Sequence, residues 1–236
     1  MQNATLIIAG HLRNSCAAPA ELEKHVMLCR GVMLECRVVL VTYSVIDGPD
    51  SRRRNNSEPK PSSWSCIEHL VSTLNISSTV VLSPPDTRHE SPIIWPHSSG
   101  RISSYKSMTN SILIGSRFAH ATDTVVRIRP DASKWLGALR KQRQWEAAAS
   151  VKADRLYRCP SHMLVQRTGT MARGGVLNSD ACFVGKAPVF RRFVDYWHSN
   201  LESIAQDPNA HYHQEWSMDV VSDRLKVSLL LRPRRQ

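Results

Sequence analysis

Long apolar runs and closely spaced cysteines are both missing from this sequence of 236 residues. The longest uninterrupted apolar runs, such as 38–41 and 229–231, are far shorter than the roughly 20 residues of a membrane-spanning helix. The six cysteines form no C-x-x-C pair, so the sequence indicates no zinc site, and we expect free thiols that mostly fill the core. Because 42% of the residues are hydrophobic and only 10 are glycine, a disordered or fibrous chain is excluded.

No basic segment precedes the apolar run 4–10, so this run predicts a buried strand and not a secretory leader. We therefore expect the protein to work in the cytoplasm. Three Asn-x-Ser/Thr sequons, at Asn3, Asn55 and Asn75, would matter only in a secretory compartment. On this interpretation they occur by chance.

Short β-branched runs alternate with segments of helical period through residues 1–131, which is typical of βαβ units and a mostly parallel sheet. Strands are predicted over 6–9, 37–43, 78–82 and 124–131, and helices over 20–34, 64–74 and 102–121. Beyond residue 131 the pattern predicts helices over 133–149 and 188–204, and extended runs near 155–157, 163–165 and 177–185. The polar stretch 47–63 predicts a mobile loop. We expect one α/β domain over residues 1–236, with a Rossmann-like central sheet flanked by helices.

The net charge of +11 is distributed unevenly along the chain. Residues 126–236 carry 19 basic and 10 acidic side chains, and so hold +9 of that total. Such an excess favours an anionic partner, which could be a phosphate-bearing small molecule, a nucleic acid or a membrane surface. A basic face that is merely solvated is the alternative.

Chemically useful residues follow two of the predicted strands, where ligands bind in open α/β sheets. Gly10 lets a backbone come close, with His11 beside it, and Arg13 offers a planar fork for phosphate oxygens. Thr42 and Tyr43, which end the second strand, offer hydroxyls and a ring on which a base could stack. The alternative for the first segment is a turn in which Arg13 pairs with an acid. The alternative for the second is that Thr42 and Tyr43 are ordinary strand residues.

The run Arg127-Ile-Arg129-Pro-Asp131 is the most unusual segment of the sequence. Alternation along a strand puts its three charged side chains on one face, where burial is costly unless each has a partner. A carboxylate there can hold a divalent metal or a sugar hydroxyl, and the guanidinium groups can face phosphates or acids. A buried ion-pair network of structural role is the alternative.

Two later segments also carry candidate groups. Asp180 lies among small residues and could act as a general base, or equally as a capping acid. His211 and His213 are followed by Glu215 and could supply a metal ligand or a second base, although surface histidines are common.

Several of these segments together resemble a glycosyltransferase-like family of the GT-A fold, found in bacterial surface-polysaccharide loci and in some algae and large viruses. The resemblance rests on Ile-Ile-Ala-Gly-His-Leu-Arg at 7–13, Val-Leu-Val-Thr-Tyr at 39–43, Tyr105 and Met108 before Arg-Ile-Arg-Pro-Asp at 127–131, and Ser-Asp-Ala-Cys-Phe-Val-Gly at 179–185. It extends to about residue 220. It implies a hexosyl- or pentosyltransferase that moves a sugar from a UDP or GDP sugar to a hydroxyl of a glycan. For a viral member, the cytoplasm would be that of the host.

The resemblance also implies which residues act. The half 1–131 would bind the nucleotide sugar and 132–236 would shape the acceptor site. Arg13 would contact the donor phosphates or base, and Thr42 and Tyr43 the nucleoside. The remaining implied roles are Asp131 for the metal or the sugar and Asp180 for the acceptor hydroxyl.

One departure from that family concerns the metal. Most GT-A enzymes carry an Asp-x-Asp triplet after this strand, and this sequence contains no such triplet, because Arg129 and Pro130 take the first two places. Either Asp131 binds Mn²⁺ or Mg²⁺ with help from His211, His213 or Glu215, or arginine and lysine neutralise the diphosphate without metal. We slightly favour the metal.

Three alternative functions differ in the sequence features that they need. A nucleic-acid-binding module would use the basic runs 52–54 and 232–235, which are short and lack interleaved aromatics, so it is disfavoured. A sulfotransferase or other phosphonucleotide enzyme would need a Gly-Lys-Ser/Thr pattern after the first strand, which is absent. A catalytically inactive GT-A-like protein is the third, because the metal triplet is missing.

Overall fold

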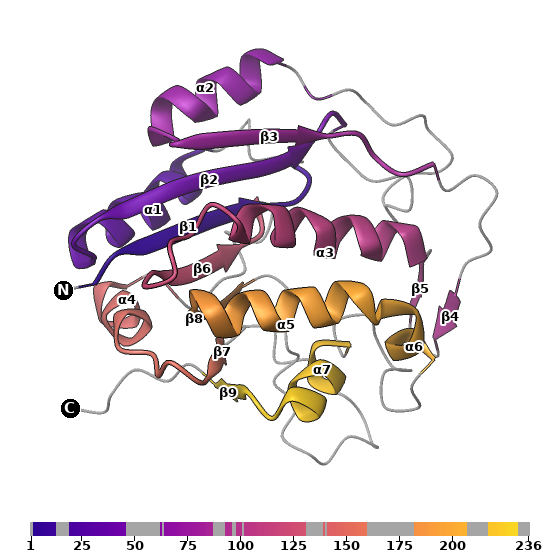
Figure 1. Ribbon diagram of the computed structural model, residues 1–236. Coiled ribbons are helices and arrows are strands. Elements are labelled where there is room, and N and C mark those ends of the chain that lie inside the picture. The colour runs from indigo at the N-terminus through magenta and orange to yellow at the C-terminus, as the bar shows by residue number, and fades with distance from the viewer. Residues whose placement is uncertain are drawn as a thin grey trace, which may run out of the picture.

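The computed structural model describes residues 2–12, 19–45, 62, 64–86, 93–95, 98–100, 102–130, 139, 141–159, 182–206 and 217–230. Within these residues, seven strands form one sheet in the order β3-β2-β1-β6-β8-β7-β9 (Figure 1). The strands are β1 (Ala4–Ala9), β2 (Cys36–Tyr43), β3 (Ser78–Leu82), β6 (Thr124–Ile128), β7 (Leu156–Arg158), β8 (Cys182–Lys186) and β9 (Ser228–Leu230). A separate antiparallel pair consists of β4 (Ile93–Trp95) and β5 (Ser98–Gly100).

The strand directions make the sheet mostly parallel. β3, β2, β1 and β6 run parallel to one another, β8 runs antiparallel to both β6 and β7, and β9 is parallel to β7. Strands from both halves of the chain therefore share one sheet, with only β8 reversed. The α/β class with a mostly parallel central sheet, predicted from the sequence, is confirmed.

Helices cover both faces of the sheet. One face packs against α1 (Ala20–Val32), α2 (Trp64–Leu74) and α4 (Gln142–Ala149). The other face packs against α3 (Ile102–Ser116), α5 (Ala187–Ser199), α6 (Leu201–Ala205) and α7 (Ser217–Leu225). Figure 1 shows α3 and α5 side by side in front of the sheet, with α1 behind it. None of the described helices is long and apolar enough to cross a membrane.

The central strands are apolar at nearly every position because both of their faces are covered. Leu6 and Ile8 of β1 point to the side of α1, whereas Ile7 and Ala9 point to the side of α3 and α5. All four side chains are fully buried. The sheet therefore separates two apolar cores.

Gly115 lets α3 lie unusually close to the sheet. A Cβ at this position would be 2.5 Å from Cγ2 of Ile7 and 3.3 Å from Cγ2 of Val41. Any larger side chain there would force the Ile7 side chain to shift.

Several element boundaries differ from the sequence predictions. α3 ends at Ser116 and not at residue 121. The amides of residues 117–119 donate to carbonyls three residues back, and the Ser116 hydroxyl donates to the Leu113 carbonyl, so the α-helical hydrogen bonding does not continue. The predicted helix 188–204 is divided at Asn200, whose side chain bonds to the carbonyl of Tyr196. β6 ends at Ile128. The extended run 163–165 and most of the loop 47–63 lie outside the described residues.

The expectation of free thiols is wrong. Cys29 bonds to Cys36 and Cys159 bonds to Cys182, and Cys66 is also disulfide-bonded. The Cα atoms of the two described pairs are 5.9 and 5.4 Å apart, within the usual range for a disulfide. Spacing along the sequence could not show this, because the fold brings together a helix end and strand ends.

Candidate functional site

The order of the strands reverses between β1 and β6. The chain passes from β1 to β2 and β3 on one side, and later places β6 on the other side of β1. In open α/β sheets, ligands bind outside the carboxyl ends of the strands at such a reversal. We call this part of the molecule the switch-point edge, and define it by Gly10, His11, Tyr43, Arg129 and Pro130.

Gly10 is held in the turn that follows β1. Its φ of +132° lies in the left-handed half of the backbone map, where a side chain is strained. The Gly10 amide donates to the carbonyl of Val41 at 3.0 Å, and the Gly10 carbonyl accepts a hydrogen bond from the buried Thr42 hydroxyl at 3.0 Å. On the other side, Arg129 and Pro130 are 3.5 Å from where a Cβ would be. Gly10 therefore connects the ends of three neighbouring strands.

His11 stacks on Tyr43. The two ring centroids are 4.4 Å apart with an interplanar angle of 24°, and Nδ1 of His11 lies 3.2 Å from the carbonyl oxygen of Val45. Tyr43 is buried, and its hydroxyl donates to the carbonyl of Ser107 in α3. Tyr43 thus has no exposed face for a base, and the half-buried imidazole of His11 is the ring nearer to solvent.

The environment of Tyr43 keeps its hydroxyl protonated. Burial raises the pKa of this group above its ordinary value of 10.0, against the lowering effect of hydrogen bonding to Ser111 and Ser107 and of the Arg127 charge. The neutral hydroxyl remains a donor to α3 and anchors the stacked pair.

Arg127 lies in the interior of the described part of the chain. Its side chain is fully buried, Nη2 donates to the carbonyl of Ala9 at 3.2 Å, and the guanidinium carbon is 5.9 Å from the centre of the Phe183 ring. The expectation that this group faces a phosphate stays a prediction; in the described chain the side chain is buried on the face of β6 against which α5 packs. Arg129, one residue beyond the strand end, is only half-buried and lies next to Gly10.

Five predicted site residues lie outside the described part of the chain: Arg13, Asp131, Asp180, His211 and His213. Described neighbours of two of them are at the switch-point edge. Pro130, which precedes Asp131, is buried beside Gly10. Cys182, two residues after Asp180, pairs with Ile128 at the carboxyl end of β6, because β8 runs in reverse.

The described side chains at this edge include no carboxylate ligand for Mn²⁺ or Mg²⁺. They supply an imidazole, hydroxyls and guanidinium groups but no carboxylate, and hard divalent cations need oxygen ligands, carboxylates above all. Among the residues that the structure describes, no three His, Cys, Asp or Glu side chains gather to hold a metal.

Sequence reasoning missed a buried polar cluster at the opposite end of the sheet. Asp123 is 2% exposed, and its Oδ2 accepts a hydrogen bond from the Thr5 hydroxyl at 2.6 Å and from the His120 amide at 3.0 Å. Nζ of Lys186 donates to the Thr124 hydroxyl at 2.9 Å. Burial lowers the pKa of Lys186, and the charge of Asp123 opposes that effect. The sequence signal that could have revealed this cluster is Asp123, a single acid directly before the apolar strand β6. Because the cluster lies at the amino ends of β1 and β6, we assign it a structural role.

A second missed group joins α3 to α5. Nδ1 of His198 lies 2.8 Å from the hydroxyl of Thr109. Burial and the nearby Lys106 charge lower the pKa of His198, against the raising effect of Asp195 and of a backbone hydrogen bond. The imidazole is thereby favoured in its neutral form.

Comparison with known proteins gives likenesses of overall shape only. No protein-family model and no curated protein matches the chain. The galactosyltransferase LgtC in complex with donor and acceptor sugar analogs is similar at 11% identity and a TM-score of 0.49, over 93% of this chain and 69% of that one. An active-site mutant of LgtC is similar at 12% identity and a TM-score of 0.48, over the same shares, 93% and 69%. The 4-diphosphocytidyl-2C-methyl-D-erythritol synthase is similar at 11% identity and a TM-score of 0.44, over 99% and 89%.

Proposed function

We propose that the chain is a glycosyltransferase that moves a hexosyl or pentosyl group from a UDP or GDP sugar to a hydroxyl of a glycan. The observation that carries this proposal is the position of Gly10. Its backbone, in a conformation that favours glycine, lies at the reversal of strand order between β1 and β6, with the Arg129 side chain against it. A turn without a side chain beside a guanidinium suits the close approach of a nucleotide diphosphate.

The donor would lie across the switch-point edge. His11, supported by Tyr43, offers a ring for the nucleoside, and Thr42 holds the carbonyl of Gly10. Arg129, with Arg13, would neutralise the diphosphate as charge builds on it during transfer. We assign Arg127 a supporting role, because its guanidinium holds the end of β1 from within.

The chemical step needs one base. The acceptor oxygen forms a bond to the anomeric carbon of the sugar, the bond from that carbon to the nucleotide diphosphate breaks, and the hydroxyl proton passes to a carboxylate. We propose Asp180 as that base if the enzyme inverts configuration, and Asp131 as the group that contacts the sugar. Residues 132–236 would shape the acceptor site.

A thermal-shift screen of nucleotide diphosphates and their sugars tests the proposal. A ligand that binds only the folded state stabilises it by about 2.7 kcal/mol at 100 times its Kd. We expect one UDP or GDP species to raise the melting temperature of the wild type and of Gly31→Ala, but not of Gly10→Ala. If no nucleotide raises it, the proposal fails.

Two further variants separate binding from chemistry. Asp180→Asn should keep the nucleotide-dependent shift and lose sugar transfer, measured as release of the nucleotide diphosphate in the presence of acceptor. A wild-type chain that binds the donor but transfers nothing would be the inactive alternative. Random oligonucleotides that bind with steep salt dependence, unaffected by Asp131→Asn, would instead indicate a nucleic-acid-binding module.

Metal dependence and placement in the cell stay predictions. Dependence on Mn²⁺ or Mg²⁺ rests on Asp131, His211 and His213, and predicts a donor-dependent shift that grows with Mn²⁺ and disappears in Asp131→Asn. The disulfides weigh against the cytoplasmic placement, because such bonds are rare in reducing compartments.

A further inference from the structure

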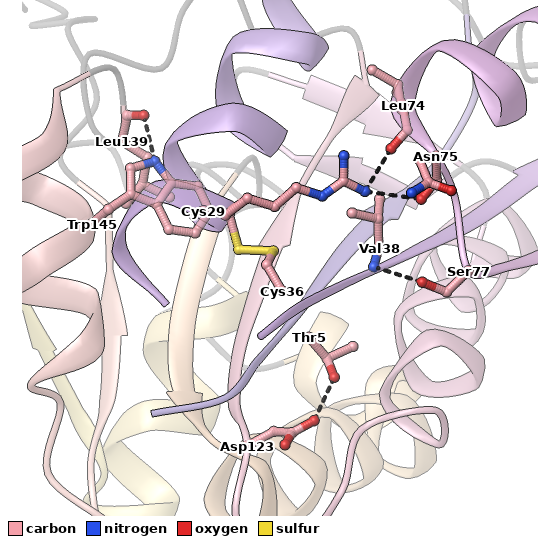
Figure 2. The surroundings of a disulfide bond; sticks show 11 residues. Thr5, Cys29, Cys36, Val38, Leu74, Asn75, Ser77, Asp123, Leu139 and Trp145 are labelled. Carbon is pink, nitrogen blue, oxygen red and sulfur yellow. Dashed lines mark hydrogen bonds between the residues drawn. A yellow bond between two sulfur atoms is a disulfide. The ribbon is translucent and has the colours of Figure 1, made fainter. Parts of the chain in front are cut away.

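Each half of the sheet's scaffold contains one described disulfide. Cys29, near the end of α1, bonds to Cys36, the first residue of β2, as Figure 2 shows. Cys159, directly after β7, bonds to Cys182, the first residue of β8. Cys29, Cys159 and Cys182 are all at most 3% exposed.

These bonds indicate where the chain folds. Structural disulfides form and persist in secreted, lumenal and periplasmic proteins, whereas cytosolic thiols are kept reduced. Cysteines from separate elements are paired here without disturbing either strand, since β2 and β8 keep their register with their neighbours. The bonds are therefore part of the fold, and they favour an oxidising compartment.

In such a compartment an Asn-x-Ser/Thr sequon becomes a site for modification. Asn75 begins the sequon Asn-Ile-Ser, and it lies in the exposed turn between α2 and β3 with a φ of 47°. Its amide donates to the carbonyl of Ser72 at 3.2 Å, and its carbonyl accepts from Nη2 of Arg30 at 2.9 Å. The backbone of the turn is thus fixed on both sides (Figure 2).

The Asn75 side chain itself is available. Its amide group makes no hydrogen bond to the rest of the described chain, in contrast to its backbone. Ser77 is exposed as well, and its hydroxyl accepts from the Val38 amide at 3.3 Å. A glycan at this position would extend from the edge of the sheet beside β3, with Asn75 distant along the chain from every residue of the switch-point edge.

The sequon at Asn3 is presented differently. Its third residue, Thr5, is fully buried in β1 and donates its hydroxyl to Asp123 (Figure 2). The carbonyl of Asn3 accepts from the amide of Thr124. This sequon is part of the sheet in the folded protein, and Asn55 lies outside the described residues.

We propose that Asn75 is an N-glycosylation site and that the chain folds in an oxidising compartment that adds glycans. The donor would be an oligosaccharide linked to a lipid diphosphate. The amide nitrogen of Asn75 forms a bond to the anomeric carbon and loses one proton, and the bond from that carbon to the lipid diphosphate breaks. This modification is independent of the transfer reaction proposed above.

The first test uses the full chain, with Asn3→Gln and Asn55→Gln, exported through the secretory pathway of a eukaryotic host. We expect the purified protein to lose the mass of one glycan on treatment with a peptide N-glycosidase. Asn75→Gln and Ser77→Ala should each abolish that loss, and Ser77→Thr should preserve it. Ser77→Ala and Ser77→Thr change the sequon but leave Asn75 in its turn, so a folding defect in Asn75→Gln would not obscure the result. A disulfide-bonded protein without a glycan on Asn75 would overturn the proposal.

The second test concerns the compartment. Protein from its own source cells, with thiols blocked at lysis, should yield peptides containing Cys29 and Cys36 that react with a second thiol reagent only after reduction. The peptides containing Cys159 and Cys182 should behave in the same way. Blocking of these thiols without reduction would place the chain in a reducing compartment and overturn the proposal.

Discussion

The guanidinium of Arg127, fully buried in β6, donates a hydrogen bond to the carbonyl oxygen of Ala9 at the end of β1, 3.2 Å away. The bond joins the two strands that flank the reversal of strand order. The residue after Ala9 is Gly10, so the position of the proposed donor-binding turn depends on a cation that the donor would not contact.

Arg127→Leu should lower the free energy of unfolding by about 1–3 kcal/mol, because the Ala9 carbonyl would lose this donor. The matched control is Arg117→Leu, in the exposed turn after α3, which should change it by less than about 0.5 kcal/mol. Urea denaturation of the two variants measures the difference. Equal stability would mean that the contact with Ala9 contributes nothing.

Gly10→Ala should destabilise the fold by about 1–3 kcal/mol through backbone strain, since the space for a Cβ is ordinary and only the φ of +132° opposes it. Gly31, exposed in α1 with nothing within 4 Å of its Cβ position, gives the opposite expectation. Gly31→Ala should stabilise the fold by about 0.5–1 kcal/mol. Thermal unfolding of both variants decides whether conformation or contact makes Gly10 necessary.

Gly115→Ala should cost about 1–3 kcal/mol by overpacking, because the new methyl group would overlap Cγ2 of Ile7. A double-mutant cycle with Ile7→Ala provides the check. In the Ile7→Ala background the cost of Gly115→Ala should shrink, since the overlapping atom is gone. An unchanged cost would show that the strain arises elsewhere.

His198 should make folding sensitive to mild acid. Because its pKa in the folded state is below the ordinary 6.5, the unfolded chain takes up the proton first as the pH falls. Stability should therefore decline below pH 6.5 until the folded-state pKa is passed, and His198→Gln should lack that part of the decline. Urea denaturation over this range measures it, with His69→Gln, at an exposed position of α2, as the comparison variant. Parallel curves for the wild type and His198→Gln would contradict the assignment.

Much of the fold could be predicted because hydrophobic periodicity and turn residues along the sequence indicate the individual helices and strands. α2 and β3 were predicted with their observed bounds, since an amphipathic helix there precedes a β-branched strand that Pro84 and Pro85 close. The end of α3 was not predicted, because side-chain hydroxyls and three-residue turns compete with the helix only once its apolar face is placed.

Contacts between elements that are distant in the sequence could not be predicted from it. Alternation showed that Arg127 shares a face with other charged residues, but not that α5 packs against that face. Tyr43 was expected to offer its ring to a base, and instead it is covered by His11 and bonded to α3. The bond between Cys29 and Cys36 depends on a helix end returning to a strand start, which spacing does not encode.

α3 is held on the sheet at two points along its length. Tyr43 bonds to the carbonyl of Ser107 in its first half, and Gly115 presses against Ile7 and Val41 in its second half. Fluctuations that expose one end of this helix must therefore also separate it from β1 and β2. Amide protons along α3 should exchange with deuterium only in the slowest, global opening of the molecule.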